Sequence, residues 1–335
     1  MNIVARSTAW EWFKLRRRWM PWILLIVVVL FSQLGVWPAY FGYNELGRGG
    51  QVTMVSSGQF GGPGEQRPIS VECADVMAEP PRVADLDPAL VPGLRVQCAE
   101  VTKRAAEQLP IAYANFTLPG SIGQAMTTAS ALGSILIAVL AASTVGVEYS
   151  WGTLRTVLVR GTGRWQYLAG KIAVLLLAAL AALIVVVGVT AVSSLVAQSL
   201  VEAPAGYVAP GWGDALGAIG RAWFGFVPMI ALVVLLTVLT SSTAMGMAIG
   251  IGYTIAEPLI MLLVGQLSDR VTVVTDYLLA ANINGWTGGG AAAFGAAGGL
   301  SSLHHFIVLS LYTVVFVALA AWLIESRDVT KATGT

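Results

Sequence analysis

The chain has 335 residues, of which 56% are hydrophobic and 11% are charged, and its formal net charge is +1. A composition this apolar excludes an ordinary water-soluble domain and predicts a polytopic membrane protein. The small net charge, and the lack of a basic tract interleaved with aromatic residues, argue against nucleic acid as a partner.

Six apolar runs along the chain are long enough to span a membrane, since about 20 residues of helix cross about 30 Å of hydrocarbon. We therefore predict an all-α polytopic membrane protein with spanning helices at 19–40, 121–146, 172–200, 222–241, 244–265 and 306–324. These runs contain no Asp, Lys or Arg, and their one carboxylate is Glu257 in the fifth.

Basic residues gather in three segments outside these runs: 1–18, 147–171 and the tail 325–335. The positive-inside rule assigns such segments to the cytoplasm. With six spans, both termini then lie together on that side. We expect a multi-pass protein of the bacterial inner membrane. The basic residues concerned are Arg6, Lys14, Arg16, Arg17, Arg18, Arg155, Arg160, Arg164, Lys171, Arg327 and Lys331.

The first basic segment, 1–18, has the pattern of a helix lying in the membrane plane. Thr8, followed by Glu11 three residues later, predicts a capping box at the start of this helix. Helical spacing gathers apolar side chains on one face and basic ones largely on another. Such an elbow helix either anchors the first span or supports a cytoplasmic partner. Trp12, Leu15 and Trp19 form the apolar face, and the basic residues are Lys14, Arg16, Arg17 and Arg18.

Residues 41–120 are rich in Gly, Pro and charge and are long enough for a small extracytoplasmic cap. The chain's two cysteines, Cys73 and Cys98, both lie there. An oxidising compartment would permit a disulfide between them, and two free thiols are the alternative. Closing a loop of this length would stabilise the cap by roughly 3 kcal/mol.

The second basic segment, 147–171, predicts a short amphipathic helix between spans two and three. Trp151, Leu154 and Leu158 recur at i, i+3 and i+7, with Arg155 beside them and Glu148 one turn earlier. Gly161 and Gly163 are expected to end it. This helix either rests on lipid headgroups or is presented to another protein, its apolar face entering a groove.

The fifth span is marked by Glu257, followed by Pro258. A carboxyl group facing lipid is costly, so we expect Glu257 to face protein or water. One interpretation places it on a translocation path or gate, and the other has it bonded to a neighbouring helix. Upstream, a small-residue face permits close helix packing. That face consists of Gly246, Gly250 and Gly252.

Residues 266–303 contain the Gly/Ala tract "NGWTGGGAAAFGAAGGL", which resists a continuous helix. The segment is either a flexible outer loop or a re-entrant pair of short helices, and we favour a partly re-entrant element. His304 and His305 follow it, and adjacent residues point to different sides of a helix. We interpret them as interfacial histidines at the start of span six.

Catalytic and cofactor motifs are missing from the sequence. "GTGRWQYLAGK" has the wrong glycine spacing for a phosphate-binding loop, and Ile172 follows its lysine. There is no H-E-x-x-H, no G-x-S-x-G and no Cys/His cluster at metal spacing. We therefore expect no enzymatic activity, metal or cofactor in this chain.

The run "EYSWGTLRTVLVRGTGRWQYLAGK" (148–171) resembles the cytoplasmic loop of six-helix exporter permeases of ATP-binding cassette (ABC) transporters, the ABC type-2 permease family. "EWFKLRRR" (11–18) is similar to the elbow helix of that family, and "IESRDV" (324–329) to its ending after span six. The outer segment of about 80 residues departs from most short members.

The resemblance implies a permease that dimerises, with itself or a sibling, and pairs with separate ATPase chains that bind ATP and Mg. It further implies that Glu148, Trp151, Leu154, Arg155 and Leu158 contact the ATPase, assisted by the elbow helix. Two alternatives stay open. One is a membrane-embedded enzyme around Glu257 and the two histidines, and the other is a scaffold whose cap binds a partner.

Overall fold

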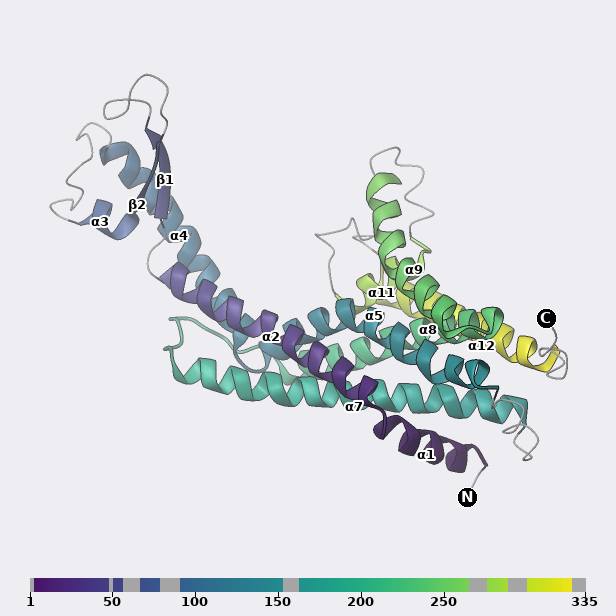
Figure 1. The fold of residues 1–335 in the computed structure, drawn as a ribbon. Coiled ribbons are helices and arrows are strands. Elements are labelled where there is room, and N and C mark those ends of the chain that lie inside the picture. The colour runs from purple at the N-terminus through teal and green to yellow at the C-terminus, as the bar shows by residue number, and fades with distance from the viewer. Residues whose placement is uncertain are drawn as a thin grey trace. The chain divides into compact units, whose positions relative to one another are not determined.

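The computed structural model describes residues 3–47, 51–56, 67–78, 91–152, 163–264, 276–288 and 300–326. These residues fold almost entirely into helices (Figure 1). The helices are α1 (Ile3–Arg16), α2 (Trp19–Gly47), α3 (Cys73–Met77), α4 (Val91–Phe116), α5 (Gly120–Ser150), α7 (Arg164–Ser199), α8 (Trp212–Thr240), α9 (Thr243–Val264), α11 (Leu279–Thr287) and α12 (Ser302–Ser326). The described residues also contain two strands, β1 (Gln51–Ser56) and β2 (Arg67–Glu72).

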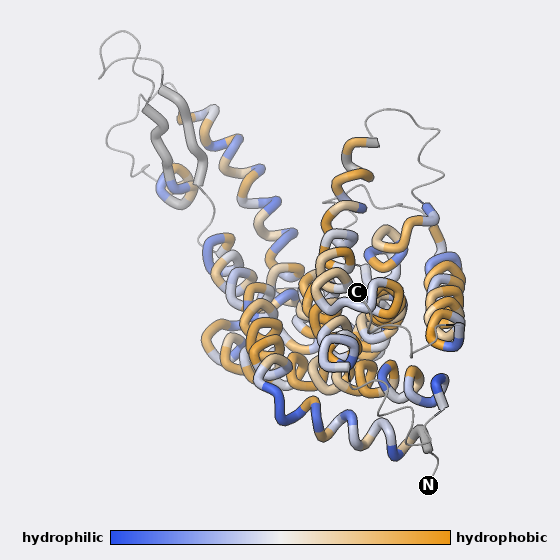
Figure 2. The backbone as a smooth tube through the Cα atoms, turned by 45° about the vertical axis from the view of Figure 1, so that its right-hand side comes forward, coloured by the Kyte–Doolittle hydropathy of each residue, from blue (hydrophilic) through white to orange (hydrophobic). Residues whose placement is uncertain are grey.

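Six of the helices, α2, α5, α7, α8, α9 and α12, are long and apolar enough to cross a membrane. Figure 2 shows that apolar residues dominate them. The protein is therefore a multi-pass membrane protein with a helical membrane part, which confirms the predicted fold class. Each predicted span lies largely within one of these helices.

Two helices begin well before the predicted spans. Helix α7 starts at Arg164, and its 36 residues extend over about 54 Å, more than a bilayer core requires. Lys171 consequently lies in the second turn of α7, although the sequence placed it in a loop. Helix α8 starts at Trp212, ten residues before the predicted span.

The chain forms two compact units, and the first comprises Met1–Gln33, Ile122–Thr190 and Trp212–Thr335. Its core follows α8, which packs against α9, α11 and α12. On α9, a Cβ atom at Gly250 would lie 2.8 Å from Val233 of α8, and one at Gly246 would collide with Thr237. The predicted close packing is confirmed for these two glycines, whereas Gly252 faces open space.

The second unit comprises Leu34–Ser121 and Ala191–Gly211. Aromatic side chains form its core, with the Tyr113 and Tyr207 rings 4.7 Å apart and Phe116 fully buried beside them. The Tyr43 hydroxyl donates to the Glu202 carbonyl oxygen at 3.0 Å. The ends of α2 and α4 and the segment that follows α7 are thus joined within this unit.

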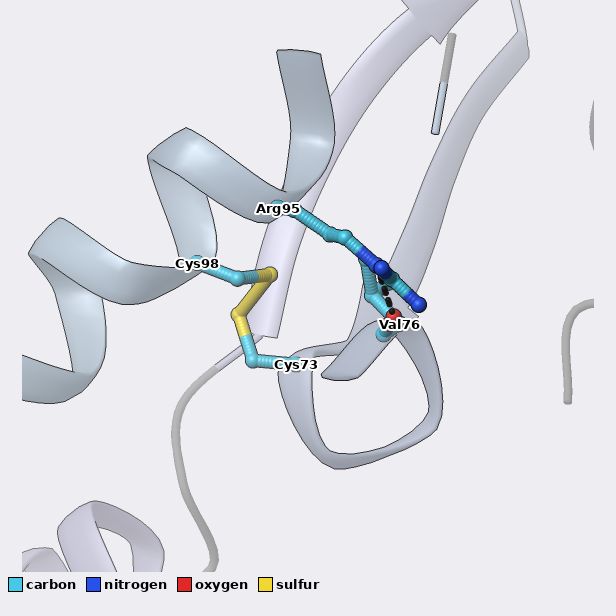
Figure 3. The surroundings of a disulfide bond; sticks show 4 residues. All are labelled: Cys73, Val76, Arg95 and Cys98. Atoms are coloured by element: carbon cyan, nitrogen blue, oxygen red, sulfur yellow. Dashed lines mark hydrogen bonds between the residues drawn. A yellow bond between two sulfur atoms is a disulfide. The ribbon is translucent and has the colours of Figure 1, made fainter. Parts of the chain in front are cut away.

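The small cap predicted for residues 41–120 lies in this second unit. Strands β1 and β2 pair antiparallel, from Gln51 opposite Glu72 to Ser56 opposite Arg67. The sequence analysis did not predict these strands. Cys73 of α3 and Cys98 of α4 form a disulfide, with Cα atoms 5.2 Å apart, so the structure shows the first of the two alternatives that the sequence left open (Figure 3). Arg95 donates to the Val76 carbonyl beside it.

The elbow helix α1 differs from its prediction at the start. It begins at Ile3, so Thr8 lies inside the helix and the predicted capping box does not form. The Glu11 carboxylate instead binds lysine side chains. The apolar face is split as well, because Leu15 is buried while Trp19 is exposed at the start of α2.

Candidate functional site

Four charged side chains meet where α1, the end of α5 and the start of α7 come together. We call Glu11, Lys14, Glu148 and Lys171 the charge cluster. The Lys171 ammonium lies 2.6 Å from Glu11 Oε2 and 2.7 Å from Glu148 Oε1, and it donates to the Thr144 carbonyl at 3.1 Å. Lys171 is only 2% exposed. One buried lysine therefore joins three helices.

The second lysine of the charge cluster lies nearer the surface. Lys14 Nζ is 2.8 Å from Glu11 Oε1, one helical turn away, and 3.7 Å from Glu148 Oε1. Two carboxylates and two ammonium groups balance to zero net charge. This balance matters because a buried charge without a partner costs several kcal/mol.

Local sequence explains why α1 can approach α7 so closely. A Cβ atom at Gly170 would lie 2.7 Å from the Ser7 hydroxyl oxygen, so the missing side chain makes room for α1. Leu15, one turn after Glu11, is buried on the same helix. Gly170 and Lys171 are neighbours, so the close approach and the ion pair occur together.

The pKa of Glu11 reflects two opposing influences. Burial raises this pKa, but the nearby Lys171, together with Lys14, outweighs burial and holds the pKa below its ordinary value. Opposite charges at this range favour the ionised carboxylate. Glu11 is therefore ionised at neutral pH and pairs with both lysines.

The loop between α5 and α7 is held at both ends. Glu148 anchors its start through Lys171. At its end, Arg164 donates to the carbonyl oxygens of Ile324 and Glu325 in α12, at 3.1 and 2.6 Å. The Gln166 side chain accepts from the Gly163 N–H at 3.1 Å and caps α7. The two ends of this loop are thereby connected to α1, α5, α7 and α12.

The predicted docking residues fall into three groups. Trp151 is 74% exposed, in the turn that ends α5. Leu154, Arg155 and Leu158 lie outside the described residues. The docking contact predicted for Glu148 is corrected, because its side chain is buried in the last turn of α5 and binds Lys171.

The elbow-helix residues are also divided by the structure. Lys14 belongs to the charge cluster, whereas Arg16 and Arg17 are exposed and Arg18 is half-buried. The Arg17 guanidinium lies 4.3 Å from the centre of the Phe13 ring. The basic end of α1 therefore remains accessible while Lys14 is engaged inside.

Glu257 forms a second polar site, on α9. Its side chain is 4% exposed, and Oε1 accepts the Ala281 backbone N–H at 3.0 Å, in the first turn of α11. A carboxylate is favoured at a helix N-terminus, where backbone N–H groups lack partners. The structure thus gives Glu257 the bond to a neighbouring helix that was one of its two interpretations.

Asn282, within α11, bonds to the residues before this helix and to α12. The Asn282 amide donates to the Asp276 and Leu278 carbonyls at 2.8 and 2.7 Å, and its Oδ1 is 2.9 Å from His305 Nδ1. His304 Nε2 faces the Asp276 carbonyl at 3.2 Å. Within the Gly/Ala-rich segment, residues 279–287 therefore form the helix α11, which packs against α8, α9 and α12. The re-entrant path stays a prediction.

Glu257 and His305 thus bond to two successive residues of α11, Ala281 and Asn282. Within the described parts of the chain, no group of three or more His, Cys, Asp or Glu side chains is placed to hold a metal ion. Sequence reasoning missed Lys171 as the centre of the charge cluster. The sequence feature that could have indicated this role is the position of Lys171 directly before the apolar run of span three.

Comparison with known proteins gives one result on the family. No curated protein matches the chain. A family model described as "Protein of unknown function (DUF2705)" matches residues 96–330, from α4 to beyond α12. Because this match covers well over half of the sequence, the chain belongs to the DUF2705 family.

Proposed function

We propose that this protein is the transmembrane subunit of an ABC exporter, driven by ATPase subunits on separate chains. The observation that carries this proposal is the loop between α5 and α7, which is tied at its start to α1 and α7 by the charge cluster and at its end to α12 by Arg164. A loop fixed in this way suits the transmission of force from a partner into several spanning helices. The 148–171 run that resembles the exporter permeases comprises this loop, the last residues of α5 and the first residues of α7.

In this proposal, two copies of the chain, or one copy and a sibling, form a translocation path in the bacterial inner membrane. Both termini and the loop face the cytoplasm, where the ATPases bind ATP and Mg. Closure of the ATPases pushes on the loop through the exposed Trp151 and the predicted contacts Leu154, Arg155 and Leu158. The charge cluster passes this movement to α1, α5 and α7 as one body, because separating buried ion pairs costs several kcal/mol.

Co-purification with a candidate ABC ATPase expressed together with this chain tests the proposal. The wild-type chain should retain the ATPase and change its rate of ATP hydrolysis. The double variant Leu154→Asp/Arg155→Glu should lose both effects while the protein remains folded. Trp151→Ala should weaken the complex.

Trp212→Ala provides the matched control, because Trp212 is also an exposed tryptophan, 60% accessible, at the start of α8. In the proposed topology this residue lies on the opposite side of the membrane, so its replacement should leave ATPase binding unchanged. Equal effects of the two tryptophan variants, or intact coupling in Leu154→Asp/Arg155→Glu, would refute the proposal.

A further inference from the structure

A cavity of about 260 Å³ opens between α1, α2, α5 and α7 in the first unit. Its lining is apolar, and the one charged lining residue is Arg16, in the last turn of α1. Spanning helices α2, α5 and α7 form most of its wall. A space of this kind within a membrane protein is accessible to apolar molecules of the bilayer.

Small side chains create this space. Helix α7 contributes Ala178, Ala179, Ala181 and Ala182 to the lining. On α5, a Cβ atom at Gly133 would lie 2.6 Å from the Phe226 ring, so Phe226 of α8 packs against backbone and closes the cavity on that side. An empty apolar cavity lowers stability in proportion to its volume. An apolar occupant would recover contacts that the lining residues lack.

Positive charge is concentrated where α1 meets the cavity. Arg16, Arg17 and Arg18 follow one another, and none of them forms an ion pair within the described residues. The neighbouring lysines are neutralised in the charge cluster. The Trp22 indole N–H donates to the Arg16 carbonyl oxygen at 3.0 Å and fixes this corner between α1 and α2.

The surrounding residues indicate that this corner lies at the level of lipid headgroups. Trp12 and Trp22 both line the cavity, and tryptophan is enriched at membrane interfaces. Exposed guanidinium groups at that level attract anionic lipids. An apolar cavity beside three arginines that form no ion pair with any described residue matches a molecule with an acyl chain and a negatively charged headgroup.

We propose that this cavity binds one acyl chain of an anionic phospholipid, whose phosphate group is held by Arg16, Arg17 and Arg18. This site is separate from the loop that would contact an ATPase, and it does not depend on the transport proposal. A bound lipid would fill the space between the elbow helix and the first three spanning helices. It would thereby link the position of α1 to the composition of the bilayer.

Native mass spectrometry of the full chain in detergent, titrated with phosphatidylglycerol or phosphatidylcholine of identical acyl chains, tests the proposal. The wild type should bind one phosphatidylglycerol at least tenfold more tightly than phosphatidylcholine, as expected for three guanidinium groups near one phosphate. The variant Arg16→Gln/Arg17→Gln/Arg18→Gln should bind both lipids equally. Ala178→Leu/Ala182→Leu fills the cavity and should lose the tight phosphatidylglycerol site.

Leu177→Phe/Ile184→Phe is the matched control, because it enlarges two exposed side chains of the same helix outside the cavity lining. This control should bind phosphatidylglycerol like the wild type. Thermal unfolding of each variant identifies any that fails to fold, and Ala182→Leu alone then replaces the double variant.

Three results would overturn the proposal. The first is equal binding of both lipids by the wild type, and the second is full phosphatidylglycerol binding by the folded cavity-filled variant. The third is a change of oligomeric state in that variant with unaltered lipid binding, which would show that a second copy of the chain covers the cavity.

Discussion

Replacement of Lys171 by methionine provides the sharpest test of the charge cluster. The ammonium group contacts Glu11, Glu148 and the Thr144 carbonyl and is shielded from solvent. Removing it leaves the two carboxylates with Lys14 alone, and the charge cluster changes from neutral to a net charge of −1. Removing one partner of a buried ion pair typically destabilises a protein by about 3–5 kcal/mol. We expect a loss of this size in the free energy of unfolding.

Glu148→Gln added to Lys171→Met restores neutrality, because Glu11 and Lys14 then remain as a pair. The double variant should therefore be more stable than Lys171→Met alone, and the double-mutant cycle should give a coupling energy above roughly 1 kcal/mol. Urea unfolding in detergent measures stability, and hydrogen exchange of the α1 amides reports whether this helix detaches.

The control for this experiment is the surface pair Arg104–Glu100 on α4, whose nitrogen and oxygen atoms are 3.0 Å apart and whose side chains are 70% and 55% exposed. Arg104→Met should cost no more than about 0.5 kcal/mol, as exposed i,i+4 pairs do. If Lys171→Met costs as little as this control, or if the cycle shows no coupling, the reasoning about the charge cluster is wrong.

Three further predictions follow from the contacts of Glu11, Gly250 and Glu257. Since the pKa of Glu11 is lowered in the folded protein, ionised Glu11 stabilises the fold fully above the ordinary carboxyl pKa, and this stabilisation disappears as the pH falls through the lowered pKa. The protection of the α1 amides from hydrogen exchange should therefore decline only below the ordinary carboxyl pKa. Gly250→Val should destabilise the protein by about 1–3 kcal/mol because its Cβ meets Val233, whereas Gly252→Val, in open space, should be nearly neutral in the same thermal unfolding assay. Glu257→Gln keeps an oxygen that can accept the Ala281 N–H, whereas Glu257→Leu does not. In chemical unfolding, the free energy of unfolding of Glu257→Leu should therefore be about 1–3 kcal/mol lower than that of Glu257→Gln. Equal free energies for the two variants would show that the bond to Ala281 is unimportant.

Several features of the fold could be predicted because each depends on a short stretch of sequence. The spanning helices follow from the length and composition of apolar runs, and the structure places a helix at every one. The disulfide required only two cysteines in one segment outside the apolar runs. The close approach at Gly246 and Gly250 followed from their spacing on one helix face.

The errors arose where partners come from distant segments. Thr8 and Glu11 have capping-box spacing, yet α1 extends to Ile3 and Glu11 binds lysines. Glu148 has the spacing of a docking residue, but α5 continues past it and its carboxylate is used inside the protein. Local spacing cannot show which helix end will contact a charged side chain.

The sequence by itself therefore determined the membrane class and the approximate positions of the six long apolar helices that the structure describes, because hydropathy and composition act locally along the chain. Only the tertiary structure decided that Lys171 joins three helices, that Glu257 caps α11, and that an alanine-rich face of α7 borders a cavity beside Arg16. These features depend on distance and burial between segments far apart in the chain. A charge becomes costly, and a small side chain leaves a space, only after helices have packed around it.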